Sequence, residues 1–218
     1  MENWIKLISY KSILEFLQRD FGLVFRNSLL LTAIYFLLIP VIRGISNLNH
    51  IQSAQCFSQS VALIGIIILV PIIQYELDMS IKEIVCTKTW SYLKSVIIRL
   101  FCGFAIISVA IIGFALIMQS RNCMFPFWTY VISTILYAGF MGTAGILFSQ
   151  IGSNIGAGYL TALGYWSLCQ LQIISENNVV SLFPIVAGNF EIQKLIILIG
   201  VLVIMILGTV LSIIKINH

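Results

Sequence analysis

Residues 195–214 form the run LIILIGVLVIMILGTVLSII, which contains no charged side chain. An α-helix rises about 1.5 Å per residue, so a run of this length crosses the roughly 30 Å of hydrocarbon in a bilayer. A helix that is apolar on every side has no face suited to water. The stretch therefore predicts a transmembrane helix and indicates an integral membrane protein.

The rest of the chain has the same character. Of its 218 residues, 60% are hydrophobic and 9% are charged, whereas about a quarter of the residues of an ordinary soluble domain are charged. No stretch departs from this composition, so we expect an all-α fold, a single transmembrane domain over residues 1–218 and no nucleic-acid partner. Six runs are long enough to span: Leu23–Ile42, Phe57–Tyr75, Val96–Met118, Pro126–Phe148, Ala157–Ile174 and Leu195–Ile214.

An amphipathic segment over residues 1–21 precedes the first run. Leu7, Tyr10, Leu14 and Leu17 share one stripe at helical spacing, and polar or charged side chains cover the rest. The segment is too charged to span and is predicted to lie in the membrane interface. No small-residue cleavage site follows the first run, so we expect this run to remain in the mature protein.

The basic residues predict the orientation. Nine of the twelve Lys and Arg residues lie in or beside the N-terminal segment, the second connection and the tail, and three lie on the opposite side. The positive-inside rule therefore places both termini and the second connection in the cytoplasm. The expected location is the cell membrane, with short external connections near Asn47, Arg121 and Glu176. The nine are Lys6, Lys11, Arg19, Arg26, Lys82, Lys88, Lys94, Arg99 and Lys215, and the three are Arg43, Arg121 and Lys194.

Signals for chemistry are missing from the predicted spans. The five cysteines are scattered singly, the two histidines lie at positions 50 and 218, with His50 in a predicted external loop, and no HExxH pattern occurs. There is also no glycine-rich phosphate loop followed by Lys and Ser or Thr. We therefore expect no catalytic residue, no metal site and no cofactor on this chain.

The second connection carries the most informative pattern. Over residues 76–90, Leu77, Ile81, Ile84 and Val85 fall on one face of a short helix whose other face is charged. Such a helix can dock into a groove of a soluble partner. The alternative is a helix that rests on the lipid headgroups.

The same segment resembles the coupling helix of type-2 ATP-binding-cassette permeases, in which an amphipathic helix precedes six spans. Two further stretches are similar to that family: Gly142–Ser149 with the turn Ser153–Ala157, and Ser181–Pro184 before the last span. The family's usual Gly and Pro in the coupling segment are replaced by Ser80 and Thr89. The residues that the resemblance places at the ATPase interface are Glu76, Leu77, Ser80, Ile81, Glu83, Ile84, Val85 and Thr87.

The resemblance implies a function and partners. These are a second permease subunit, identical or related, and separate ATP-binding-cassette ATPase subunits that hold ATP and Mg²⁺. Export is the commoner direction in that family, so the expected cargo is amphipathic: an antimicrobial peptide, a drug or a lipid-like molecule. In this family the second and fifth spans line the dimer interface, which makes Gln74, Tyr75, Trp166 and Gln170 candidate pathway residues. Hydrogen bonding between helices is the alternative role for these side chains.

Two other functions remain as alternatives. A ligand-capturing subunit of a vitamin-type importer would need a small-residue docking face on its first span, where the stretch Leu29–Ile39 offers only Ala33 and Thr32. A membrane-embedded protease or transferase would need ionisable residues at bilayer depth. Glycines within the spans, such as Gly65, Gly142 and Gly164, are predicted to allow close helix packing.

Overall fold

The computed structural model describes residues 25–73, 92–171, 173–174 and 192–216. The predicted interfacial helix over 1–21 and the predicted coupling segment over 76–90 lie outside these residues. Within them, all regular secondary structure is helical. The all-α class is therefore confirmed for the part of the chain that the structure describes.

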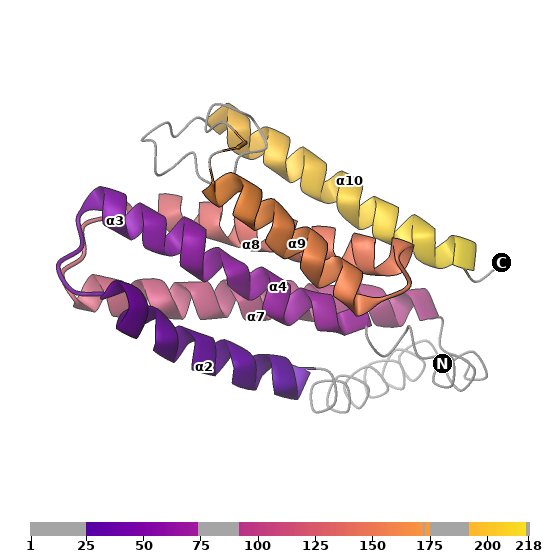
Figure 1. Cartoon of the computed structure of the whole chain (residues 1–218), viewed down its shortest axis with the longest axis horizontal. Coiled ribbons are helices and arrows are strands. Elements are labelled where there is room, and N and C mark those ends of the chain that lie inside the picture. Colours follow the sequence, from indigo (N-terminus) through magenta and orange to yellow (C-terminus); the bar gives the residue numbers. More distant parts are fainter. Residues whose placement is uncertain (1–24, 74–91, 172, 175–191, 217–218) are drawn as a thin grey trace, which may run out of the picture.

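The described helices form an antiparallel bundle (Figure 1). Each helix runs opposite to the one before it, so the start of the first and the end of the last lie at the same end of the bundle. We call the helix over residues 50–73, whose turns are of several types, helix 50–73. The elements are α2 (Arg26–Arg43), then α3 (His50–Gln55), η2 (Cys56–Ser60), η3 (Val61–Leu63), α4 (Ile64–Leu69) and η4 (Val70–Ile73) within helix 50–73, then α7 (Tyr92–Ser120), α8 (Phe127–Ile151), α9 (Ile155–Gln170) and α10 (Ile192–Ile216).

Five helices of the described part are long and apolar enough to cross a membrane: those over Arg26–Arg43, His50–Ile73, Val96–Ser120, Phe127–Ile151 and Gln193–Ser212. The predicted fifth span, Ala157–Ile174, differs. Its helix, α9, ends at Gln170 after 16 residues and so rises only about 24 Å. Beyond it, the amides of Ile173 and Ile174 both donate to the carbonyl of Leu168, at 3.2 and 3.5 Å, which turns the chain away from the helix axis.

The second span begins earlier than predicted. Helix 50–73 starts seven residues before Phe57, because a capping box forms in which the amide of Asn49 donates to the Gln52 side chain at 3.2 Å. Ser53 and Ala54 are already buried. The prediction of an external loop that includes His50 was therefore wrong, since His50 is the first helical residue.

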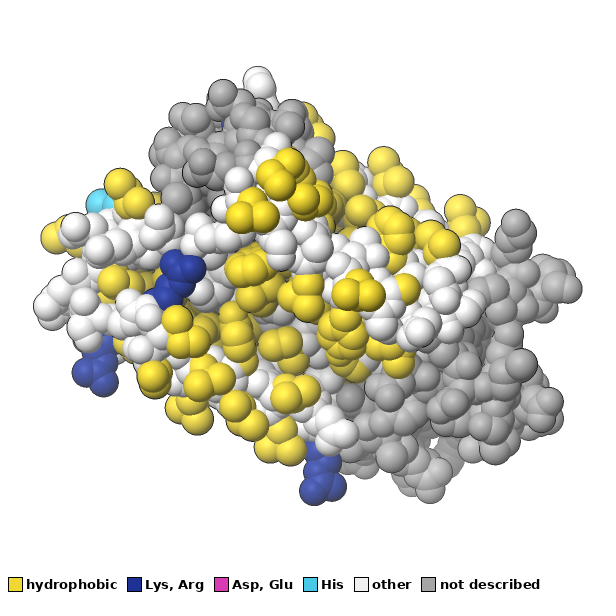
Figure 2. Space-filling view, in the orientation of Figure 1, with side chains coloured by type: hydrophobic (Ala, Val, Ile, Leu, Met, Phe, Trp, Pro, Cys, Tyr) yellow, Lys and Arg dark blue, Asp and Glu magenta, His cyan; other side chains and the backbone are white. Residues whose placement is uncertain are grey.

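Helix 50–73 and α8 form the centre of the bundle, and most of their residues are buried. The other long helices bury one side and expose large apolar side chains on the other, such as Leu37 on α2, Val109 on α7 and Ile204 on α10. Figure 2 shows hydrophobic side chains across the visible face, with few Lys and Arg. In a bilayer, such a surface faces lipid.

Glycines bring the two central helices together. A Cβ atom at Gly65 would overlap the backbone of Ala138 on α8, and one at Gly142 would overlap the carbonyl of Gly65 and the side chain of Leu69. Close packing is thereby confirmed at Gly65 and Gly142. Gly164 on α9 is different, because a Cβ there would meet no described atom within 4 Å.

Two connections pair at one end of the bundle, which we call the loop end. The amide of Asn47 donates to the carbonyl of Arg121 at 3.1 Å, and the amide of Met124 donates to the carbonyl of Leu48 at 3.0 Å. The thiol of Cys123 also donates to the carbonyl of Ile45 at 3.3 Å. The connection over residues 152–154 lies at the opposite end, which we call the turn end (Figure 1).

Candidate functional site

One line of side chains on helix 50–73 remains incompletely covered. From Ala54 to Ile73, every residue is buried except Gln55, Gln59, Ser60, Leu63, Ile67 and Pro71. Apart from Ser60, these lie at i+4 spacing, and such residues form a ridge along a helix. We call Gln55, Gln59, Leu63, Ile67 and Pro71 the open line. Its half nearer the loop end is polar and its other half is apolar.

The open line passes through a widened turn. The segment η2 (Cys56–Ser60) is a π-helical turn, followed directly by the 3₁₀ turn η3. Such turns leave carbonyl groups without their usual α-helical partners, and they occur often at functional sites. Here, side chains from two other helices donate hydrogen bonds to two carbonyls of this turn. The indole Nε1 of Trp166 on α9 donates to the carbonyl of Gln59 at 3.0 Å, and the hydroxyl of Tyr35 on α2 donates to the carbonyl of Ser60 at 2.9 Å.

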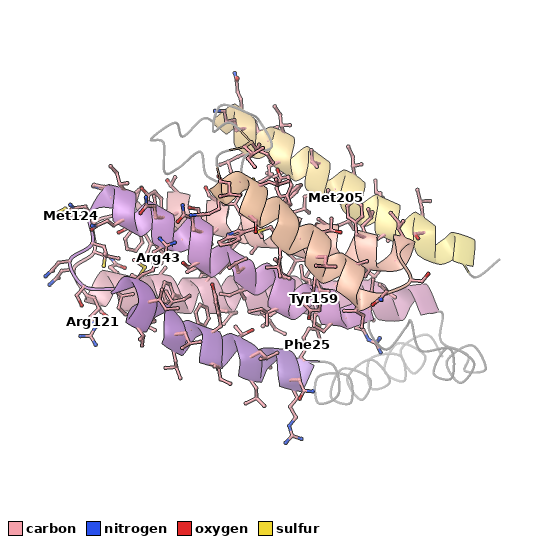
Figure 3. All side chains as sticks on the ribbon, in the orientation of Figure 1. Phe25, Arg43, Arg121, Met124, Tyr159 and Met205 are labelled. Carbon is pink, nitrogen blue, oxygen red and sulfur yellow. The ribbon has the colours of Figure 1, made fainter. Side chains whose placement is uncertain are left out.

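A cation also reaches this turn. Arg43, the last residue of α2, donates from its guanidinium to Oε1 of Gln59 at 2.8 Å. Figure 3 shows Arg43 lying against helix 50–73, whereas Arg121 extends away from the bundle at the loop end. Because Arg43 is exposed, its guanidinium has further N–H groups free to face solvent or headgroups.

An aromatic cluster closes the bundle between the widened turn and the loop end. The ring of Phe57, which is fully buried, lies 5.1 Å from Phe125, 6.0 Å from Tyr130 and 6.1 Å from Phe114, measured between centroids. The hydroxyl of Tyr130 donates to the carbonyl of His50 at 3.3 Å. These contacts hold one side of the turn, while the open line on the other side is only partly covered.

The structure places two of the predicted pathway residues. Trp166 is half-buried and makes the hydrogen bond to Gln59, so the alternative role of helix-to-helix bonding is observed for it. Gln170, one turn further along α9, is exposed. Gln74 and Tyr75 lie outside the described residues, as do the predicted ATPase-interface residues Glu76, Leu77, Ser80, Ile81, Glu83, Ile84, Val85 and Thr87.

Sequence analysis missed Tyr35, Arg43, Gln55 and Gln59. A signal was present, since Gln52, Gln55 and Gln59 follow each other at spacings of three and four residues, which share one helix face. It went unused because the helix was expected to start at Phe57. The widened turn itself has no sequence signal that we recognise.

The site offers binding groups. All eight acidic residues of the sequence lie outside the described residues. Among the described residues, no three His, Cys, Asp or Glu side chains come together as a metal site would require. The site instead presents neutral amides, a guanidinium and an indole beside an apolar ridge. Amides both donate and accept hydrogen bonds, so they suit a polar group of either kind.

Together, the apolar helices and the buried central pair define a multi-pass α-helical membrane protein. Comparisons with protein-family models, with curated proteins and with solved structures found no match.

Proposed function

We propose that this chain is the membrane-spanning permease subunit of an ATP-binding-cassette exporter, which moves an amphipathic cargo using ATP hydrolysed by a separate subunit. The observation that carries the proposal is the open line, because polar amides at bilayer depth are costly unless they face protein, water or cargo. Gln59 lies nine residues into helix 50–73, about 14 Å from its start. If the helix starts at the boundary of the hydrocarbon, Gln59 lies inside it, and the long side chain of Arg43 would extend from Gln59 toward the headgroups.

The division of the open line fits an amphipathic cargo. A polar head group would bond to Gln55 and Gln59, with Arg43 nearby for an anionic group, and an apolar body would lie along Leu63 and Ile67. Trp166 already uses its N–H on Gln59, so its part in the pathway is to offer its ring.

We further propose six spans, with α9 as the fifth. The alternating direction of the helices supports this topology, since α9 returns from the turn end to the loop end. Its 16 residues leave Gln170 about 8 Å short of the far boundary of the hydrocarbon if the helix starts at the near one. An exposed Gln at that depth requires a polar partner or water, which the interior of a transporter supplies.

The partner permease fits the uncovered face of α9. Leu160, Leu163 and Leu168 are exposed there beside Gly164, where no described atom lies within 4 Å of a built Cβ. Small residues let helices approach closely in lipid. A second copy or a related permease placed here would also cover Gln170.

The ATPase is proposed to dock on the cytoplasmic segment 76–90. The test is to purify the tagged chain with an ATP-binding-cassette ATPase identified by mass spectrometry, and then to measure ATP hydrolysis and transport in lipid vesicles. Ile84→Asp and Glu83→Lys are expected to abolish both while the chain still inserts, and Lys82→Ala, off the apolar face of the predicted helix, is the matched control. Full coupling in the first two variants, or transport by the purified chain without an ATPase, would refute the proposal.

A further inference from the structure

Two helices flank the open line. α2 packs on α4 and α9 packs on η4, and helix 50–73 lies between α2 and α9 in Figure 1. From these two helices, Tyr35 reaches the carbonyl of Ser60 and Trp166 reaches the carbonyl of Gln59. Helix 50–73 is thus held from both sides, and the open line is the strip of its surface that remains partly exposed.

A cation is held beside the polar half of this strip. The guanidinium of Arg43 donates to Oε1 of Gln59 at 2.8 Å. Side chains on a helix lean toward its N-terminus, and α2 and helix 50–73 run in opposite directions. Arg43 therefore leans toward the turn end and Gln59 toward the loop end, so the two side chains meet. A guanidinium has five N–H groups, and those that Gln59 does not use can bind a second acceptor.

The charges around this cation favour an anionic ligand. Among the described residues there is no carboxylate to balance Arg43, because all eight acidic residues of the sequence lie outside them. Gln55, one turn nearer the loop end on the same strip, adds an amide that can donate or accept a hydrogen bond. A guanidinium binds phosphate oxygens through paired, charge-assisted hydrogen bonds. Phosphate is therefore the acceptor that this part of the site fits.

The apolar half of the strip has the length of an acyl chain. Helix 50–73 has 24 residues and rises about 36 Å, some 6 Å more than the thickness of the hydrocarbon. Its first turn can therefore extend into the headgroup region, which brings Gln55 near the boundary. From Gln55 to Ile67 the strip runs about 18 Å, close to the roughly 15 Å of hydrocarbon in one leaflet. Leu63 and the ring of Trp166 lie along this path.

We propose that the open line binds one anionic phospholipid from the leaflet at the loop end. Its phosphate is bound by Arg43 and Gln55, and one acyl chain lies along Leu63 and Ile67 beside Trp166. A neutral lipid such as phosphatidylcholine adds a cationic group, for which the described part of the site offers no carboxylate, so phosphatidylglycerol binds more tightly. The binding does not depend on the proposed function. Only a role of this lipid as the cargo would rest on it.

The experiment measures which lipid contacts Trp166. The full chain, with Trp166 as its remaining tryptophan, is placed in vesicles that mix phosphatidylglycerol and phosphatidylcholine, and one lipid at a time carries brominated acyl chains. Bromine quenches indole fluorescence on contact, so the two titrations give the relative affinity of the two lipids. Exposed charge pairs contribute little, and we expect phosphatidylglycerol to be preferred about two- to five-fold. The tryptophans replaced by Phe are Trp4, Trp90 and Trp128.

Variants at two arginines separate the site from the general surface charge. Arg43→Gln is expected to remove the preference, and Arg43→Lys to retain part of it, because the charge remains but the paired geometry is lost. Arg121→Gln is the matched control: it removes one charge at the same end of the bundle, from a side chain that extends away from helix 50–73 (Figure 3). Circular dichroism checks that each variant is folded. Raising the salt from 0.1 to 1 M shortens the screening length from about 10 to about 3 Å and is expected to weaken the preference without any substitution at Arg43.

Three results would overturn the site. The first is equal quenching by the two lipids while Arg43 is present. The second is a preference that survives Arg43→Gln, or falls equally in Arg121→Gln. The third is quenching by neither lipid, which would mean that a second copy or another segment of the chain covers the open line. None of these measurements involves an ATPase, so failure of the lipid site and failure of the proposed function are distinguishable.

Discussion

Replacing Gly65 with Ala tests whether close backbone contact holds the central pair of helices together. In lipid, helices associate through van der Waals packing, because lipid tails remove the hydrophobic driving force between them. The new Cβ at Gly65 would overlap the carbonyl oxygen, carbonyl carbon and Cα of Ala138. These are backbone atoms of α8, so no rotamer change relieves the overlap and one helix must shift.

The magnitude follows from two opposing effects. Overpacking a well-filled interior costs about 1–3 kcal/mol, whereas Ala in place of a mid-helix Gly gains about 0.5–1 kcal/mol. Gly113 on α7 isolates the second effect, because a Cβ there meets no described atom within 4 Å. We expect Gly113→Ala to be neutral or stabilising and Gly65→Ala to be less stable than Gly113→Ala by about 1–3 kcal/mol, the cost of the overlap alone.

The assay is reversible unfolding in mixed micelles of dodecyl sulfate and a mild detergent, followed by circular dichroism and tryptophan fluorescence. The double variant Gly65→Ala with Gly142→Ala should destabilise by less than the sum of the single variants, because both residues lie in one contact. If the free energies of unfolding of Gly65→Ala and Gly113→Ala agree within about 0.5 kcal/mol, the reasoning about backbone contact is refuted.

Three further predictions follow from other contacts. The variants Asn47→Cys and Asn122→Cys should react with a membrane-impermeant maleimide from one side of the membrane, and Ser153→Cys from the opposite side. The reason is that the first two residues lie at the loop end and the third at the turn end. Labelling of all three from one side would contradict the topology. Thr134→Val should change the free energy of unfolding by no more than about 0.5 kcal/mol, because the buried Thr134 hydroxyl bonds only within its own helix; a larger loss would indicate a missed contact between helices. Arg43→Gln should lower stability by less than about 1 kcal/mol in the same assay, since the lost bond is exposed, and a greater effect would mean that the guanidinium has a buried partner.

The position of α9 shows where sequence analysis was insufficient. Its hydrophobic run continues to Ile174, and composition alone gave no reason to end the helix at Gln170. The helix stops because Ile173 and Ile174 bond back to Leu168, a choice that depends on how the chain leaves the bundle. The prediction for the second span erred in the opposite direction, because its hydrophobic run starts only at Phe57 whereas the helix already includes the polar residues Gln52 and Gln55.

The sequence by itself determined the all-helical class, the membrane environment and most of the spans. These properties depend on the length and apolarity of single segments, which are local quantities. Only the tertiary structure decided that helix 50–73 and α8 are central, that Gly65 meets the backbone of Ala138, and that Tyr35 and Trp166 meet one widened turn. Those features arise from side chains that are 25 and 107 residues from their partners in the sequence. Nothing in a single segment specifies which carbonyl a distant hydroxyl or indole will find.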